Sequence, residues 1–494
     1  MKRNFYKLLC LSLSFAMLLV MFAGCGKEPV SSPTDVTPQS AVTPLDKESV
    51  EDTTTTVSEG ETSQSSVSKE ETNESFVSKT PIASVDKVPS STPSKEESNP
   101  IHIVFQSIYS EQYTGETGIG KLWKDHFGKM EQQGIFTSYS DLDKDTAVFR
   151  ISTAVLSGRI VADVYEVSLG MSHQLAVRKV LANLFESKTL NQKAFNNGGT
   201  HSNTINGKTY GVSLRANTEV PMILYNEELV KKYAPDVDIS ALIAQNKWNY
   251  DTFRDLAKKC TVDTDGDGRN NVFGVTSGAQ LIDGMVFSQI GGYAVEQNGK
   301  ITSPLVYPGK GFETLEFART LFIADKTWAY RSDVETMWNM FANQQAGMVL
   351  FSAKDVAKYA GKISFDYGIA PLPTKDQTTT PCGITDAKVF VVLDDKENRL
   401  NDIGKWLNGV AKAENVLLAN QTYGMHGEAV RMYQQLLKNT SAEYSAGVIS
   451  YNVIVQIRGV ATISHIHSKE MMFHSIHSNL QQELGKFYAP LYPK

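Results

Sequence analysis

The sequence predicts an α/β fold in which the sheets are largely parallel. Between about residue 100 and residue 400, apolar runs typical of strands alternate with apolar patterns of helical period. The chain has 494 residues, 41% of them hydrophobic, which is enough for a large core and more than one small domain. The net charge is −6 and no basic block is present, so a nucleic-acid partner is not expected.

The first predicted elements begin near residue 100. The β-branched and aromatic run IHIVFQS predicts a strand over 101–107, and apolar residues at helical spacing predict a helix from Leu122 to the stop at Gly134. A helix over 145–156 and a strand over 161–167 follow.

The middle of the chain continues this alternation. We expect strands over 209–215 (TYGVSLR) and 220–226 (VPMILYN), a helix over 227–234, and a helix over 250–260 with Asp251 as its N-cap. The last hundred residues are expected to be mainly helical.

The N-terminus has the composition of a secretory signal. Lys2, Arg3 and Lys7 precede an apolar run over 8–24 that is shorter than the ~20 residues of a membrane span. Cys25 follows Ala23 and Gly24, which resembles a bacterial lipobox with a lipidated cysteine, although Phe22 stands where that pattern prefers Leu. The alternative is an ordinary signal peptide cut elsewhere.

A polar segment separates this signal from the folded part. Residues 25–99 are rich in Ser, Thr, Glu, Pro and Lys, with Phe76 as the one aromatic residue. Such a composition buries too little apolar surface to offset the entropy of ordering, so we expect a disordered tether. Beyond it, Cys260 and Cys382 are expected to be free thiols.

Several segments, in the right order from about 100 to 430, together resemble the extracellular solute-binding proteins of ABC importers, in particular the family that binds sugars. The most specific are NGKTYGVSL followed by ILYNEELVKKY; LSGRIVADVYEVS, KWNYDTFRDLAKKC and YGIAPLP agree with it. MWNMFANQQAGMVLFSA departs from the family pattern, because Gln344 replaces the usual Gly and Gly347 the usual Ala.

The resemblance implies a two-lobed periplasmic-binding-protein-like fold with a hinge and an interlobe cleft. The expected organisation is a signal peptide (1–24), the tether (25–99), a first lobe from 100–218 and 384–424, and a second lobe from 219–383 with C-terminal helices over 425–494. The resemblance implies a protein that passes a mono- or oligosaccharide to ABC permease subunits without catalysis. The lipobox and the tether fit this role for a protein that is lipid-anchored on the extracellular face of a Gram-positive membrane. The alternatives are a cell-surface glycan-active enzyme and a sensory binding protein coupled to a membrane kinase.

Candidate ligand residues are aromatic and planar polar side chains at strand ends and hinges, because sugars stack on aromatic rings and share hydroxyl hydrogen bonds with such groups. They are Gln106, Ser107, Tyr109, Glu166, Ser168, Arg215, Asn217, Glu219, Trp328, Phe351, Asp386 and Tyr423. For Trp248, Trp338 and Trp406, which lie at helical spacing, a core position is favoured over ligand contact.

DTDGDGRNNVFG (263–274) resembles the start of a calcium-binding loop. Its ligands would be Asp263, Asp265 and Asp267, the carbonyl of Arg269, and Asn271. Gly274 stands where an EF-hand has its bidentate Glu, and 272–275 reads as a strand, so no helix–loop–helix switch is expected. We expect a weak structural Ca²⁺ site; the alternative is an Asp/Gly turn without metal.

Overall fold

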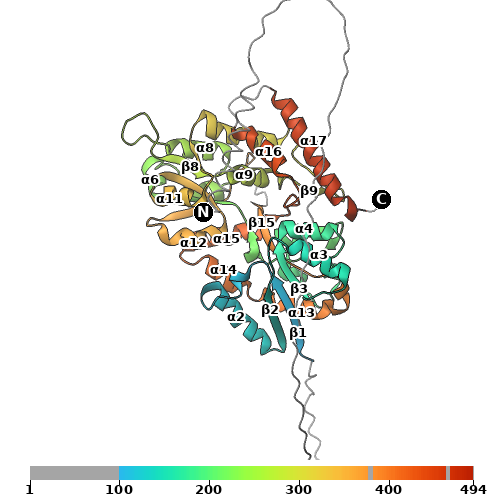
Figure 1. Ribbon diagram of the computed structural model, residues 1–494. Coiled ribbons are helices and arrows are strands. Elements are labelled where there is room, and N and C mark those ends of the chain that lie inside the picture. The colour runs from blue at the N-terminus through green and yellow to red at the C-terminus, as the bar shows by residue number, and fades with distance from the viewer. Residues whose placement is uncertain (1–98, 377–381, 463–467, 493–494) are drawn as a thin grey trace, which may run out of the picture. The chain divides into compact units, whose positions relative to one another are not determined.

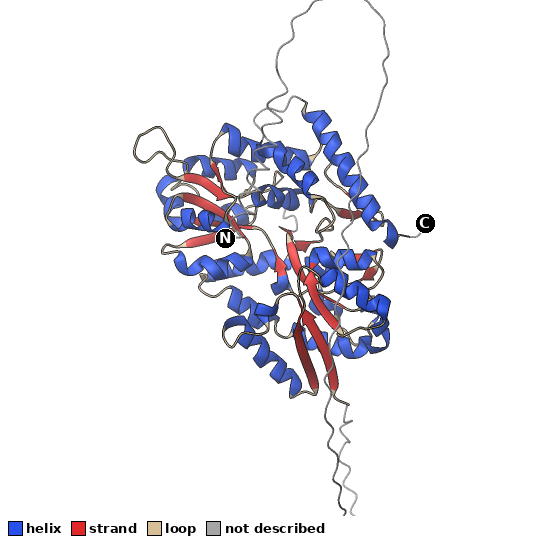
Figure 2. Ribbon diagram, viewed as in Figure 1, coloured by secondary structure: helices blue, strands red, loops and turns tan. Residues whose placement is uncertain are grey.

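The computed structural model describes residues 99–376, 382–462 and 468–492, which belong to one compact unit. The predicted signal peptide, Cys25 and nearly all of the predicted tether lie outside these residues. The framework of the unit is two five-stranded sheets with helices packed against them (Figure 1, Figure 2).

The first sheet has the order β2-β1-β3-β15-β6. Its strands are β1 (Ile101–Ser107), β2 (Ile135–Asp141), β3 (Val164–Ser168), β6 (Thr218–Glu219) and β15 (Asp386–Val391). The helices of this lobe are α2 (Gly118–Glu131), α3 (Ala147–Ser157), α4 (Leu169–Val177), α5 (Gly198–His201), α13 (Leu400–Ala411) and α14 (Glu414–Gln421).

The second sheet has the order β11-β8-β12-β7-β13. Its strands are β7 (Met222–Asn226), β8 (Phe273–Ser277), β11 (Trp328–Tyr330), β12 (Ala346–Phe351) and β13 (Tyr367–Ala370). The helices of the remaining chain are α6 (Glu227–Tyr233), α7 (Ile239–Ala244), α8 (Tyr250–Lys259), α9 (Gln280–Ile290), α10 (Lys310–Arg319), α11 (Val334–Ala342), α12 (Ala353–Tyr359), α15 (Gly427–Lys438), α16 (Tyr451–Thr462) and α17 (Lys469–Tyr488).

Strand directions differ from the prediction of largely parallel sheets. β15 is antiparallel to β3 and β6, and β7 is antiparallel to β12 and β13. β7 and β15 are the strands through which the chain enters one sheet after leaving the other, so they run against the strands built by local strand–helix units. Both sheets are therefore mixed. Apolar periodicity carries no information about strand direction, so the sequence pattern did not predict this.

Two local predictions are also wrong. Of residues 209–215, only the first belongs to a strand, β5 (Lys208–Thr209), and Val212 makes an isolated bridge to Phe390. The N-cap of α8 is Asn249, which forms a capping box with Thr252, and Asp251 lies inside the first turn. Asn is as good a cap as Asp, so the residue type alone did not decide between neighbouring positions.

The tryptophans at helical spacing lie in the core, as predicted. Trp248, Trp338 and Trp406 are 5%, 1% and 0% exposed. Cys260 and Cys382 are free and buried, which confirms the prediction for both thiols.

The two sheets are connected by the chain at several places. β7 begins three residues after β6 ends, and β15 follows the short strand β14 (Cys382–Gly383). β14 pairs in parallel with β16 (Thr440–Ser441), at the start of the segment that leads from α15 to α16. In this segment the carbonyl oxygen of Ala446 lies 3.2 Å from Nδ1 of His173 on α4.

Glu443 is a buried carboxyl group in the same segment. It is 1% exposed and accepts hydrogen bonds from the backbone amides of Tyr293 and Ser445. Burial raises the pKa of Glu443 from 4.5 to about 8, and Asp283 contributes to the same direction. The group is therefore neutral in the folded protein at pH values where it is charged in the unfolded chain.

This shift predicts how stability depends on pH. The pKa of Glu443 is higher in the folded than in the unfolded protein. Its contribution to the free energy of unfolding is therefore fully present below about pH 4.5 and is lost as pH rises through about 8. Glu443→Gln, which cannot ionise, should therefore reduce the fall in unfolding free energy between these pH values, measured by urea unfolding. Glu470→Gln, at an exposed position of α17, is the control; an equal effect of both variants would contradict the assignment.

Candidate ligand-binding site

Six of the predicted ligand residues lie together at the carboxyl ends of β1 and β3. Ser107 Oγ donates to Glu166 Oε2 at 2.6 Å, and the Tyr109 backbone amide donates to Ser107 Oγ at 2.9 Å. Asn217 Nδ2 lies 3.4 Å from Glu166 Oε1. Glu219 and Asp386 are paired in register between β6 and β15. We call Ser107, Tyr109, Glu166, Asn217, Glu219 and Asp386 the strand-end cluster.

The Tyr109 hydroxyl lies close enough to three carboxylates of this cluster for their charges to affect it. Burial raises the pKa of the Tyr109 hydroxyl, and the charges of Asp386, Glu166 and Glu219 raise it further, in that order. The phenol therefore stays protonated and can donate a hydrogen bond. Since the side chains of Tyr109, Glu219 and Asp386 are half-buried, part of each is open to a ligand.

Glu166 is the buried centre of the cluster. Burial raises the pKa of its carboxyl group, while Lys388 and the hydroxyls of Ser107 and Tyr113 act in the opposite direction. Tyr113 Oη donates to Glu166 Oε2 at 2.9 Å. These bonds hold Glu166 in one orientation, so it positions its neighbours rather than presenting itself to solvent.

Lys388 and Tyr113 belong to this site but were not among the predicted residues. Lys388 Nζ lies 5.1 Å from the centre of the Tyr109 ring. Lys388 stands two residues after Asp386 on β15, and strand alternation places both side chains on one face. The two-residue period of a strand could therefore have identified Lys388 from the sequence. Tyr113 follows the turn after β1, and no periodic pattern indicates that its hydroxyl reaches Glu166.

Three other predicted residues have structural partners away from the cluster. Gln106 Nε2 donates to Ser140 Oγ at 3.0 Å, because alternation along β1 turns it to the face opposite Ser107. Ser168 caps α4 by accepting from the Met171 amide. Arg215 forms a two-pronged ion pair with Glu414, with both nitrogen–oxygen distances 3.0 Å.

The three remaining predicted residues are aromatic; two of them are buried and one is exposed. Trp328 is 3% exposed and donates from Nε1 to the carbonyl of Ser277 at 3.2 Å. Phe351 is 4% exposed and packs edge-on against Trp338. Tyr423 is 83% exposed, so its ring is available to a partner but is not held in place.

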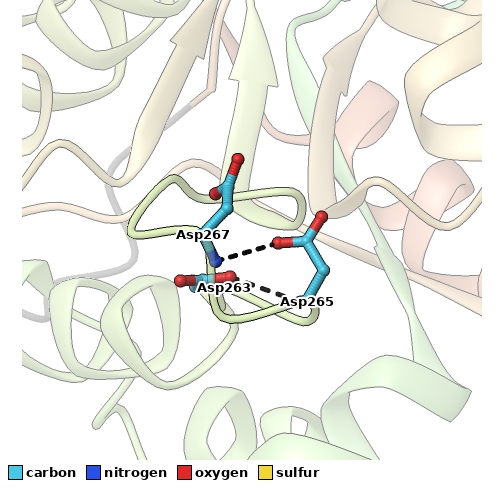
Figure 3. Close-up of side chains that lie close together, drawn as sticks. All are labelled: Asp263, Asp265 and Asp267. Carbon is cyan, nitrogen blue, oxygen red and sulfur yellow. Dashed lines mark hydrogen bonds between the residues drawn. The ribbon is translucent and has the colours of Figure 1, made fainter.

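The acidic loop brings its three aspartates together (Figure 3). One ligand atom from each of Asp263, Asp265 and Asp267 lies within 4.8 Å of the others. Gly266 and Gly268 adopt positive φ angles of 77° and 84°, which glycine reaches without steric strain. A bridge between Val262 and Val272 closes the base of the loop.

Hydrogen bonds inside the loop use many of the same oxygens. Asp263 accepts from the amides of Gly266 and Gly268, both at 2.7 Å. Asn271 Oδ1 accepts from the Thr264 amide, and its Nδ2 donates to Asp265 Oδ2 at 2.9 Å. These are the bonds of an Asp/Gly turn, but a carboxylate oxygen has two lone pairs and can accept an amide while facing a cation. The donor set therefore fits a weak Ca²⁺ site.

The two mixed sheets, the strand-end cluster and the repeated crossings between the sheets define a two-lobed binding protein. The chain belongs to the bacterial extracellular solute-binding protein family, whose sequence model matches residues 128–415, more than half of the chain. A comparison with curated proteins found no match. Among the described residues, no helix is both long enough and apolar enough to cross a membrane.

Solved structures share the fold at low sequence identity. An ABC substrate-binding protein from Listeria monocytogenes in complex with cycloalternan is 14% identical, with a TM-score of 0.54 over 78% of this chain and 100% of that chain. The galacto-N-biose-/lacto-N-biose I-binding protein of a Bifidobacterium longum ABC transporter is 12% identical, with a TM-score of 0.57 over 80% and 98%. The Staphylococcus aureus extracellular solute-binding protein in complex with maltose is 10% identical, with a TM-score of 0.57 over 80% and 100%.

Proposed function

We propose that the protein captures a mono- or oligosaccharide outside the cell and delivers it to the permease subunits of an ABC importer. The observation that carries the proposal is the strand-end cluster, in which a half-buried tyrosine ring lies among carboxylates, an amide and a lysine. Rings that stack and planar groups that share hydrogen bonds with hydroxyls are the two means by which proteins hold sugars. Membership of the family and the saccharides bound by three proteins of the same fold support the same class of ligand.

Binding without chemical turnover is part of the proposal. The family is one of binding proteins, and Glu166 is engaged by hydroxyl and amide donors that hold its orientation. Release of reducing sugar from any glycan by the purified protein would contradict this part.

We further propose that Cys25 carries a lipid and that the polar segment 25–99 tethers the lobes to the membrane. An anchored protein stays at high effective concentration near a permease in the same membrane. The expected result is that the wild-type protein partitions into the detergent phase of a cell extract and that Cys25→Ser moves it to the aqueous phase.

A thermal-shift screen of the full chain tests the binding function. Maltose, maltotriose and lacto-N-biose are the saccharides, and glycerophosphocholine is the non-saccharide comparison. A ligand at one hundred times its Kd stabilises the folded protein by about 2.7 kcal/mol, so a saccharide that fits should raise the melting temperature. No rise with any saccharide, or a rise with glycerophosphocholine alone, would contradict the proposal.

We also propose that the acidic loop binds Ca²⁺ as a structural ion. At a free calcium concentration of about ten times Kd, binding should stabilise the protein by about 1.4 kcal/mol, seen as a higher melting temperature than with a chelator. Asp265→Asn should remove the difference, whereas Asp236→Asn, an exposed aspartate paired with Lys259, should keep it. Identical melting temperatures of the wild type at millimolar calcium and with chelator would rule out the site.

A further inference from the structure

The second lobe contains a groove of about 540 Å³ that is separate from the strand-end cluster. The start of α8, the length of α10, the loop before α10 and the first turns of α17 supply its walls. Its volume lies in the range of small-molecule sites, roughly 300–1,000 Å³.

Aromatic rings form the floor of this groove. Tyr250 and Phe317 are stacked with ring centres 4.0 Å apart and an angle of 5° between the planes. Phe312 and Phe473 are stacked at 3.9 Å. Phe317 is half-buried, as is Tyr307 from the loop before α10, so both rings keep part of their surface open. Such rings offer flat apolar surface to the C–H face of a sugar.

Three ion pairs surround the floor of the groove. Glu313 pairs with Lys375 at 2.8 Å, and Asp376 pairs with Lys310 at 2.5 Å. The third pair joins Glu316 on α10 to a lysine of α17. Asp251 also lines the groove, so three of its four carboxylates face a lysine. This lining does not favour an anionic ligand, and it presents polar groups suited to hydroxyls.

Glu316 has hydrogen-bonding capacity that the described residues do not fill. Its Oε2 is paired with Lys469 Nζ at 2.6 Å, whereas Oε1 is buried and has no hydrogen-bond partner among these residues. A buried acceptor without a donor destabilises the folded protein, because it has lost its hydrogen bonds to water without replacing them. A small rotation of this half-exposed side chain would bring Oε1 toward a ligand in the groove. A hydroxyl of that ligand would then be the missing donor.

We propose that this groove is a second saccharide-binding site, distinct from the strand-end cluster. Neutral sugar units stack on Phe317 and Tyr307, and their hydroxyls bond to the carboxylates of Glu313 and Glu316. We infer a saccharide ligand from the residues of the groove itself and not from the strand-end cluster. The proposed function enters only through the saccharides chosen as probes.

Binding stoichiometry tests the proposal. Isothermal titration of the full chain with maltotriose and with lacto-N-biose should show two sites for at least one of the two sugars. Phe317→Ala should remove one site, Phe317→Tyr, which keeps the ring, should retain both, and Tyr109→Ala should remove the other. Phe149→Ala removes an equally apolar ring that is 73% exposed on α3 and should leave both sites unchanged.

The outcomes separate the groove from the cluster. A single site lost in Tyr109→Ala and kept in Phe317→Ala overturns the groove and leaves the proposed function intact. A site lost in Phe317→Ala and kept in Tyr109→Ala supports the groove, even if the cluster binds neither sugar. Binding of neither sugar to the wild type overturns the groove. If Phe317→Ala lowers the melting temperature, Glu313→Gln is the second variant, and a groove affinity unchanged by it also overturns the proposal.

Discussion

Tyr109→Ala is expected to weaken saccharide binding at the strand-end cluster by roughly 30- to 700-fold. The ring is half-buried and lies beneath the ammonium group of Lys388, so it is held in place before a ligand arrives. Removing a well-packed aromatic anchor from a binding site typically lowers the binding free energy by about 2–4 kcal/mol, and each 1.4 kcal/mol is tenfold in Kd. Isothermal titration with the saccharide that gives the largest thermal shift measures the effect.

Tyr109→Phe is the matched control for this variant. It keeps the ring and removes the hydroxyl, whose pKa is raised by burial and then by Asp386. If stacking dominates, the affinity of Tyr109→Phe should fall only about fivefold, which corresponds to one neutral hydrogen bond of about 1 kcal/mol. Unchanged affinity in Tyr109→Ala would show that the saccharide binds elsewhere.

Trp406→Ala should destabilise the first lobe by about 3–5 kcal/mol. Trp406 on α13 is 0% exposed, and its ring packs against Phe105 at 5.3 Å and Phe390 at 6.1 Å between ring centres. Its Nε1 donates to Thr137 Oγ1 at 2.9 Å. The substitution therefore leaves a cavity between β1, β2 and β15, and it should appear as a lower urea midpoint.

Two further variants separate the parts of this effect. Trp406→Phe keeps most of the apolar volume and loses the hydrogen bond, so a smaller loss than in Trp406→Ala is expected. Phe149→Ala, at a 73% exposed position, should change stability by less than about 0.5 kcal/mol. A loss below about 1 kcal/mol in Trp406→Ala would contradict the central position of this residue in the core.

Much of the fold could be predicted because local pattern determined it. The strand over 101–107 coincides with β1, since its β-branched and aromatic residues alternate between buried and more open positions. The helix over 227–234 corresponds to α6. The antiparallel directions of β7 and β15 could not be predicted, because they depend on where the chain crosses between lobes rather than on local residues.

The candidate site was predictable to the extent that strand ends converge. Ser107 ends β1 and is paired in register with Glu166 of the neighbouring parallel strand β3, so their meeting followed from the prediction of these two strands. Arg215 could not be separated from these residues, because its partner Glu414 lies almost two hundred residues further along the chain. The burial of Trp328 could not be predicted either, because it depends on edge-on packing against Phe322 and on a hydrogen bond to the carbonyl of Ser277.

A crystal structure of the protein with the saccharide that gives the largest thermal shift tests the central claim most directly. We predict a sugar ring stacked on Tyr109, with hydroxyls bonded to Asp386 or Glu219 at the ends of β15 and β6. A crystal in which saccharide is bound but no saccharide molecule contacts Tyr109, Asp386 or Glu219 would contradict the assignment of the strand-end cluster as the ligand-binding site.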